Sequence, residues 1–311
     1  MYFPFTSETY TQTMGTRPLG DRGLVEIDTP HYDAEIALKA QILASDLRYY
    51  AQALPYSEPA QWDMIELLLP DLAARHPERF GLSVEGDVWR WHNLRSGDVT
   101  VFQLGAPADL PHMPIDWLGR QIQEDLILMS GDAASGCPLI AGQLCFGSSW
   151  SLDDKIGLSF LDIHEPVPQF NAQLGRPANL LMERLKLGRP VWRLNWSIKS
   201  NARLNAAPRF RAEDLASKRH IALENVGERC FLRVERQALA RLPRTGAILF
   251  TIHTYNYAMS EVCADAARAA MLAGFLQTTP EPMLRYKGVL PFYEPLLVYL
   301  ERASGLAERT A

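Results

Sequence analysis

The chain has 311 residues, of which 47% are hydrophobic and 22% are charged, as in an ordinary globular protein with a substantial core. The net charge is −5 and the 31 Lys and Arg residues are not gathered into basic blocks, which argues against a nucleic-acid partner. The four Cys residues (Cys137, Cys145, Cys230 and Cys263) and the seven His residues lack metal-ligand spacing, which excludes a zinc ribbon, a zincin helix and a protein-bound iron–sulfur cluster.

The N-terminal sequence MYFPFTSETY has no cationic region followed by an apolar stretch, and no apolar run is long enough to span a membrane. We therefore expect a cytoplasmic protein with reduced thiols and no membrane partner. Because Pro and Gly are not concentrated in a linker, we predict a helical N-terminal extension over residues 1–80, followed by one integrated domain over residues 81–311.

The sequence of the first half of the chain predicts helices at its start, followed by strands. Composition and apolar spacing predict helices over 33–53 and 57–75, the second broken by Pro70. Residues 82–104 read as one or two hairpins. From Ile115 to Met129 the apolar residues recur at helical spacing, which puts the polar run 123–125 on or beside the opposite, polar face.

The second half alternates strands and helices. A strand is predicted from Leu139 to Phe146, and Ser151 with Asp154 forms a weak capping box. The remaining predicted elements are a helix over 171–187, strands over 191–198, 230–237 and 247–255, and helices from Ser260 onward. Because the strands come in neighbouring runs with helices outside them, we predict an α+β fold with an antiparallel sheet.

The last three predicted strands each carry an apolar row and a mixed polar row. The polar rows contain Arg193 and Asn195 in the first strand, Arg233 and Glu235 in the second, and Thr251 and His253 in the third. Such rows are typical of a solvated sheet face. They are also compatible with the lining of a cavity, and periodicity does not decide between the two interpretations.

His164 lies between an apolar run and the rigid Pro-Val-Pro segment 166–168. A lone His in apolar surroundings is more often a structural residue than a ligand. However, a single neutral imidazole facing an apolar site is what a b-type haem requires, and the chain has no Cys-x-x-Cys-His motif for covalent attachment.

Six segments, taken in order, resemble the haem-dependent oxidative N-demethylase family, and specifically the α subunit of dimethylamine monooxygenase. They are QEDLILM (123–129), CFGSSWSLDDKIG (145–157), IHEPVP (163–168), GRPVWRLNWSI (188–198), LRVERQALARLPRTGAILFTIHTY (232–255) and YKG (286–288). The resemblance covers roughly residues 10–290. It implies a PAS-like antiparallel sheet flanked by helices, which encloses haem b and its iron within the catalytic domain over 81–311.

The resemblance also implies a reaction and partners. The reaction is a monooxygenation in which O2 and a small secondary amine similar to dimethylamine give formaldehyde and a smaller amine. Electrons would come from NADPH through FMN and a [2Fe-2S] cluster on a separate reductase subunit. A tetrahydrofolate-dependent subunit would capture the formaldehyde.

The same resemblance assigns site residues. His164 becomes the axial ligand of the iron, and the polar-row residues are expected at the haem edge and in the distal pocket. Glu235 is the candidate to hold a secondary ammonium, with an ion pair to Arg233 or Arg236 as the alternative. Thr251 is a candidate hydrogen-bond donor to bound oxygen, with a plain β-branched strand residue as the alternative. Arg193 and Arg233 are expected to pair with haem propionates or with acids. Asn195 and His253 are expected beside them.

Two positions depart from the family pattern: His253 replaces an expected Arg, and Gln169 replaces an expected Gly. A titratable His at that place would change the polarity of the distal pocket or compete for the iron. A non-catalytic haem sensor of gas or redox state is the rival interpretation, although no sustained heptad repeat follows the domain. A hydrolase is disfavoured because GSSWS (147–151) lacks the glycine spacing of a nucleophile elbow.

Overall fold

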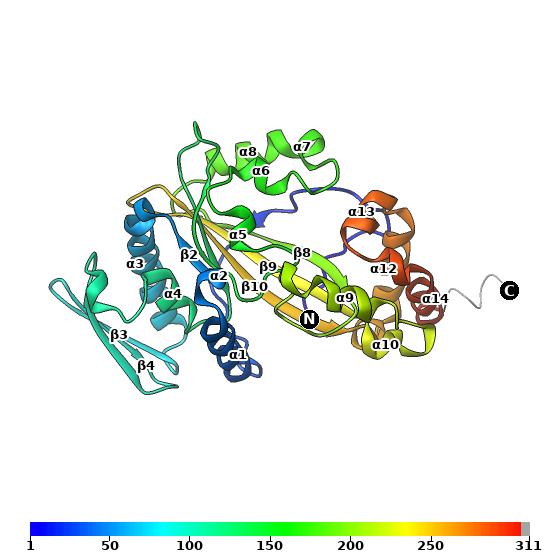
Figure 1. The fold of residues 1–311 in the computed structure, drawn as a ribbon, viewed down its shortest axis with the longest axis horizontal. Helices are drawn as coiled ribbons and strands as arrows, with labels where there is room; N and C mark the ends of the chain where they lie inside the picture. Colours follow the sequence, from blue (N-terminus) through cyan, green and yellow to red (C-terminus); the bar gives the residue numbers. More distant parts are fainter. Residues whose placement is uncertain (306–311) are drawn as a thin grey trace.

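The computed structural model describes residues 1–305 and contains one seven-stranded antiparallel sheet (Figure 1). The strand order across it is β1-β8-β9-β10-β6-β7-β2. The bounds are β1 Arg17–Pro18, β2 Ala51–Ala53, β6 Asp125–Met129, β7 Leu139–Gln143, β8 Val191–Lys199, β9 Phe231–Arg241 and β10 Ile248–Ala258. The prediction of an α+β protein with an antiparallel sheet is confirmed. Both β1 and β2 come from residues 1–80, so this segment adds two strands to the main sheet.

A second sheet has three strands and corresponds to the hairpins predicted over 82–104. It consists of β3 (Phe80–Glu85), β4 (Val88–Asn93) and β5 (Asp98–Gln103), paired antiparallel in that order. One of its faces is aromatic: Trp91 and Phe102 are each only 1% exposed. This aromatic face shares one hydrophobic core with helix α3 (Glu58–Arg75), so the small sheet is packed onto the main body.

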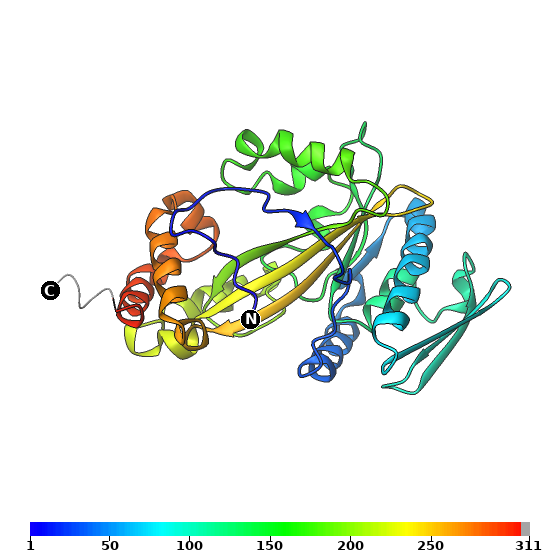
Figure 2. The same cartoon turned by 180° about the vertical axis from the view of Figure 1, so that it is seen from behind.

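The helices surround the main sheet on both sides (Figures 1 and 2). The α-helices not yet given are α1 Tyr32–Ser45, α2 Leu47–Tyr50, α4 Pro114–Gly119, α5 Leu152–Lys155, α6 Phe160–His164, α7 Phe170–Gln173, α8 Gly175–Arg184, α9 Arg211–Lys218, α10 Val226–Arg229, α11 Met259–Cys263, α12 Ala266–Thr278, α13 Glu281–Tyr286 and α14 Tyr293–Ala303. The 3-10 helices are η1 Pro55–Ser57, η2 Pro107–Asp109, η3 Pro208–Phe210, η4 Leu223–Asn225 and η5 Leu290–Phe292.

The main sheet has two faces, which we name after a histidine associated with each. The His164 face is covered by α5, α6 and α8, whose Leu152, Phe160 and Met182 share a core with Leu239 of β9 and Ile252 of β10. The opposite, His253 face is covered at one end by α3, α4 and the small sheet, and at the other by helices α10 to α14. The central strands β9 and β10 therefore bury side chains on both faces.

The N-terminal segment bridges two helical groups across the edge of the sheet at β8 (Figure 2). The Tyr10 amide donates to Thr278 Oγ1 at the end of α12 (2.8 Å), and Gln12 Nε2 donates to the Pro168 carbonyl before α7 (3.2 Å). It then reaches β1, which pairs with β8. Residues 1–18 thus help to enclose the sheet edge that carries Arg193 and Asn195.

Two local predictions from the sequence were wrong. Helix α3 continues through Pro70, because the ring faces solvent and only one backbone hydrogen bond is lost. The helix predicted from Ile115 to Met129 ends at Gly119, and residues 125–129 form strand β6, buried on both faces. Gln123, Glu124 and Asp125 are 0% exposed, although the pattern predicted a polar face. An apolar run of this length does not distinguish a buried strand from a helix.

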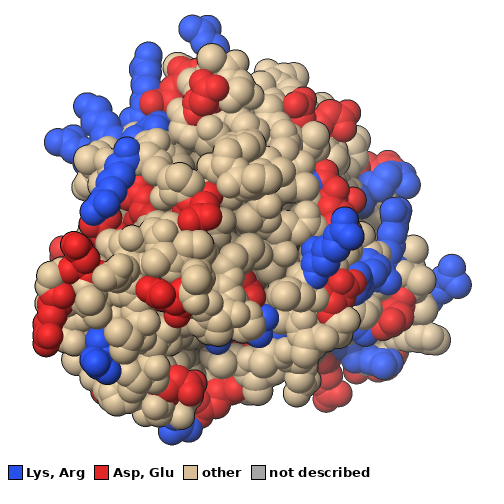
Figure 3. All heavy atoms as spheres, turned by 60° about the vertical axis from the view of Figure 1, so that its left-hand side comes forward, with Lys and Arg blue, Asp and Glu red and all other residues tan. Residues whose placement is uncertain are grey.

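The surface over the small sheet and α3 carries interspersed basic and acidic side chains around a mostly uncharged centre (Figure 3). Ion pairs at the surface of α3 include Arg75 with Asp71 (2.7 Å) and Arg244 with Glu66 (2.5 Å). Within residues 1–305, no helix has both the length and the apolar character required to cross a bilayer.

Candidate functional site

His164 is the last residue of the short helix α6, on the His164 face of the sheet. Ser159 caps the helix by accepting the Asp162 amide, and His164 Nδ1 contacts the Phe160 carbonyl oxygen at 2.8 Å. The imidazole lies 4.5 Å from the Phe160 ring and stacks on Phe170 at 4.5 Å and 16°. Burial is the main cause that lowers the pKa of His164 to about 4, so the ring is neutral near pH 7.

The segment after His164 is held by unusual backbone geometry. Gln169, between the Pro-Val-Pro segment and Phe170, has φ +58°, a left-handed conformation that costs a residue with a Cβ roughly 1 kcal/mol. A glycine, the residue expected from the family pattern, adopts it without that cost. The conformation turns the chain so that Phe170 is buried and stacks on the imidazole.

The hydrogen bond of Nδ1 decides which ring nitrogen of His164 is available to a metal ion. Because Nδ1 is engaged by a backbone carbonyl, the neutral tautomer leaves Nε2 unprotonated and able to bind a metal ion. Among residues 1–305, no group of three or more His, Cys, Asp and Glu side chains is arranged to hold a metal ion. Within residues 1–305, a metal ion at His164 would therefore need further ligands from outside the protein.

Four of the predicted site residues lie together on the His164 face. In the register of β8 and β9, Arg193 pairs with Gln237, Asn195 with Glu235 and Ser197 with Arg233. Glu235 Oε2 accepts hydrogen bonds from Asn195 Nδ2 and from Gln237 Nε2, each at 3.1 Å. Arg233 Nε lies 3.4 Å from Glu235 Oε1. Gln237 was not singled out in the sequence, although its place two residues after Glu235 puts it on the same face.

Of the interactions considered for Glu235, the structure contains the ion pair with Arg233. Arg236 points to the other face, where its Nε lies 2.9 Å from Glu26 Oε1. Glu235 is only 6% exposed. Burial raises its pKa, but Arg233, the hydrogen bond from Asn195 and the nearby Lys287 outweigh burial and lower it. Glu235 is therefore ionised near pH 7.

Two lysines that were not assigned from the sequence complete this group. Lys287 follows α13, and its Nζ donates to Asn195 Oδ1 (3.2 Å) and to the Trp196 carbonyl (2.7 Å). Lys199, at the end of β8, contacts Ser149 Oγ at 3.4 Å. Burial is the main cause that lowers the pKa of each lysine to about 8. The segment YKG (286–288) was noted as a motif, but its contact with β8 required the tertiary structure.

Thr251 and His253 lie on the opposite face of the sheet, away from Glu235. The register of β9 and β10 pairs Gln237 with Ile252 and Glu235 with Thr254, so Ile252 and Thr254 share the His164 face while Thr251 and His253 face the other way. Period-2 alternation shows which residues of one strand share a face, but not how the rows of two strands align. The expected single row of polar residues is therefore divided between the two faces.

On the His253 face the predicted residues join a compact buried network. His253 Nδ1 lies 3.0 Å from Glu124 Oε1, and Thr251 Oγ1 donates to the Leu24 carbonyl at 2.8 Å. Burial lowers the pKa of His253, but Glu124 outweighs burial and the net shift is upward. Burial raises the pKa of Glu124, but His253 outweighs burial and the net shift is downward. These two residues form a charged pair inside the protein.

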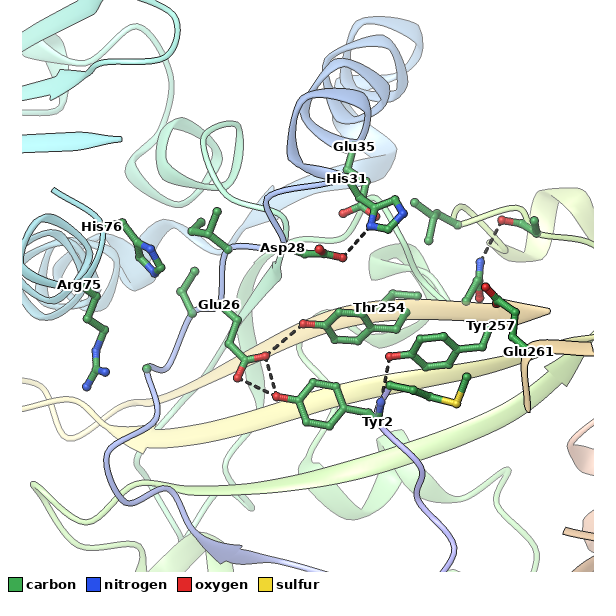
Figure 4. A pocket seen from close by; sticks show the side chains of 18 residues that line it. Tyr2, Glu26, Asp28, His31, Glu35, Arg75, His76, Thr254, Tyr257 and Glu261 are labelled. Atoms are coloured by element: carbon green, nitrogen blue, oxygen red, sulfur yellow. Dashed lines mark hydrogen bonds and ion pairs between the residues drawn. The ribbon is translucent and has the colours of Figure 1, made fainter. Parts of the chain in front are cut away.

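A cavity of about 1110 Å³ opens beside this network (Figure 4). It lies between the N-terminal segment, the start of α1, the end of α3 and the second half of β10. Tyr2 and Tyr255 direct their hydroxyl groups to Glu26, with distances of 2.8 and 3.1 Å. His31 Nδ1 lies 2.8 Å from Asp28 Oδ2. The charged groups that line this cavity are thus engaged with partners from the same chain.

The fold and the His164 face define an α+β protein that holds one neutral imidazole and several cations between a sheet and its covering helices. Residues 15–297 match the family model described as "Haem-dependent oxidative N-demethylase, alpha subunit-like". The chain belongs to this family. Haem dependence and oxidative N-demethylation make the family one of oxidoreductases, and its alpha-subunit description implies that other subunits exist.

Proposed function

We propose that the protein is the haem-containing subunit of a monooxygenase that removes a methyl group from a small secondary amine such as dimethylamine. The observation that carries the proposal is the neutral His164 imidazole, fixed through Nδ1 at 2.8 Å, in a chain that belongs to a haem-dependent N-demethylase family. His164 would hold the iron of haem b through Nε2, and Phe160 and Phe170 would orient the imidazole.

We also propose that the haem-binding part has a PAS-like fold, which is supported by the topology. Five strands form an antiparallel sheet in the order β7-β6-β10-β9-β8. Helices α5 to α8 lie between β7 and β8 in the chain, and they cover the face that carries Asn195 and Glu235.

When bound, haem supplies the activation of O2 and the oxidation of the methyl C–H bond. For dimethylamine the balance is one amine, one O2, two electrons and two protons to methylamine, formaldehyde and water. Glu235 would accept a hydrogen bond from the amine N–H, while Asn195 and Gln237 hold its carboxylate in place. The electrons would come from NADPH through FMN and [2Fe-2S] on a reductase subunit, and a tetrahydrofolate-binding subunit would capture the formaldehyde.

The first test is an absorbance spectrum of the haem-reconstituted protein, followed by an assay for formaldehyde after the reduced protein is mixed with O2 and dimethylamine. A Soret band and formaldehyde support the proposal. A protein without a Soret band would refute the haem assignment. A Soret band without formaldehyde, in a single-turnover experiment, would favour the alternative function of a haem sensor.

The role of Glu235 is tested separately with Glu235→Gln. This variant should keep its haem and bind amine much more weakly, measured as the amine-induced shift of the Soret band. Glu26→Gln is the matched control, because Glu26 is a carboxylate on the opposite face. If the two variants titrate with amine identically, Glu235 does not contact the substrate.

A further inference from the structure

The cations on the His164 face exceed the carboxylates that could pair with them. Arg193 has no carboxylate within 4 Å among the described residues, and its buried Nε has no hydrogen-bond acceptor. Lys287 donates only to uncharged oxygens, those of Asn195 and Trp196. Both side chains are half-buried, and a partly desolvated cation without an anionic partner is costly, so an anionic ligand would stabilise both groups.

The nearby carboxylate does not complete them, because it is already engaged. Glu235 faces Arg233 at 3.4 Å and accepts from Asn195 and Gln237. Arg233 in turn donates to the carbonyls of Leu204 and Phe146 and to Thr254 Oγ1. With the bond to Glu235, four of its five N–H donors are used within the chain, and the side chain is 0% exposed.

Arg193 and Lys287 act on the same region although they are far apart in the chain. Arg193 lies two residues before Asn195 on the same face of β8, and Lys287 reaches Asn195 from α13. Burial is the main cause that lowers the pKa of Lys287. Glu235 raises this pKa, and Arg193 lowers it. The two cations therefore repel each other, and an anion placed between them would relieve this repulsion.

We propose that Arg193 and Lys287, which both lie beside Asn195, bind the two propionate carboxylates of the haem. This inference rests on the proposed function, because it assumes that haem occupies the His164 face. It turns the carboxylate edge of the haem toward β8 and α13. It also assigns a role to the YKG segment, whose lysine would link the C-terminal helices to the cofactor.

Carboxylates are the natural partners of these two groups. Arg pairs with a carboxylate through two parallel hydrogen bonds, and a Lys ammonium is a compact charge that donates up to three. Haem b carries two carboxylates on one edge and is otherwise apolar. Ile252 and Leu239, which lie on the same face as Arg193, are the apolar neighbours that this orientation of the haem would use.

The test compares haem with haem dimethyl ester, which has the same ring and iron but no carboxylates. Both are titrated into the apoprotein and followed by the Soret band, for the wild type and for Lys287→Gln and Arg193→Gln. Charge-assisted hydrogen bonds predict that the wild type binds haem roughly 10- to 100-fold more tightly than the ester. Each variant should lose about tenfold of this preference. Because the preference is a ratio within one protein, partial misfolding affects both ligands alike.

Arg285→Gln is the matched control, since Arg285 lies in α13, two residues before Lys287, but is exposed and pairs with Glu281. It should keep the wild-type preference. Equal affinities for haem and ester in the wild type, or an unchanged preference in both variants, would overturn the propionate assignment and leave the proposed function intact. If neither ligand gives a Soret band, the proposed function itself fails.

Discussion

Both faces of the main sheet carry buried polar side chains, but the charged groups on the two faces are paired differently. On the His253 face, Arg236 meets Glu26 at 2.9 Å and His253 meets Glu124 at 3.0 Å. On the His164 face, the polar partner of the imidazole is a backbone carbonyl, and Arg193 and Lys287 have no carboxylate partner within the described part of the chain. A buried polar row therefore indicates a binding site only where some of its charged groups lack a partner of opposite charge.

The largest expected difference between the two faces is the effect of a histidine substitution on haem binding. Replacing His164 with Ala should weaken haem binding by more than about 100-fold, since even partners that only orient a ligand cost 10- to 100-fold. The Soret spectrum should show loss of the imidazole ligand, and added imidazole should partly restore it. His31→Ala, a change at an exposed histidine, is the control. A wild-type spectrum in the His164 variant would place the axial ligand elsewhere, with His253 the next residue to test.

A large effect on stability is expected on the other face. Glu124→Gln leaves His253 buried without its acidic partner and should lower the free energy of unfolding by about 3 kcal/mol, measured by urea denaturation. The haem spectrum should remain that of the wild type. Glu35→Gln is the control, because Glu35 is hydrogen-bonded to Gln123 (2.7 Å) and forms no ion pair within residues 1–305. Equal losses in the two variants would show that His253 and Glu124 are not a coupled pair.

The same pair should give the stability a defined pH dependence. The native pKa of His253 is raised above 6.5, so its contribution is complete below pH 6.5 and disappears as the pH rises through the native pKa. The native pKa of Glu124 is lowered below 4.5, so its contribution is complete above pH 4.5 and is lost as the pH falls through that lower pKa. The stability difference between wild type and Glu124→Gln should therefore be greatest between pH 4.5 and 6.5.

This dependence is checked by urea denaturation of both proteins from about pH 5 upward into the alkaline range. The difference in unfolding free energy should decline as the pH rises through the native pKa of His253. A difference that does not decline would mean that the pair does not lose its contribution through deprotonation of His253.

The smallest expected effect concerns Thr251. Its hydroxyl donates to the Leu24 carbonyl on the His253 face, so Thr251→Val should cost about 1 kcal/mol of stability and leave the haem spectrum and formaldehyde production unchanged. Thr251→Ser, which keeps the hydroxyl, should behave like the wild type. A loss of activity in the Val variant with haem still bound would bring Thr251 back as a residue of the reaction.

Much of the local structure could be predicted because it depends on neighbouring residues. Alternation identified the strands later found as β8, β9 and β10, and it correctly grouped Arg233 with Glu235 and Thr251 with His253. The capping box of α5 is also present, with the Ser151 amide and hydroxyl both directed to Asp154 Oδ2. Residues 125–129 were misassigned, because a strand buried on both faces has no polar alternation to reveal it.

The sequence by itself determined the family, the strands and the single histidine beside Pro-Val-Pro. These depend on short segments whose residues are close in the chain. The tertiary structure alone decided which polar rows meet, since a shift of one residue in strand register exchanges the two faces. It also decided that Lys287 reaches Asn195, because no local pattern relates α13 to β8. Pairing between distant segments determined which charges are compensated and which remain available for a ligand.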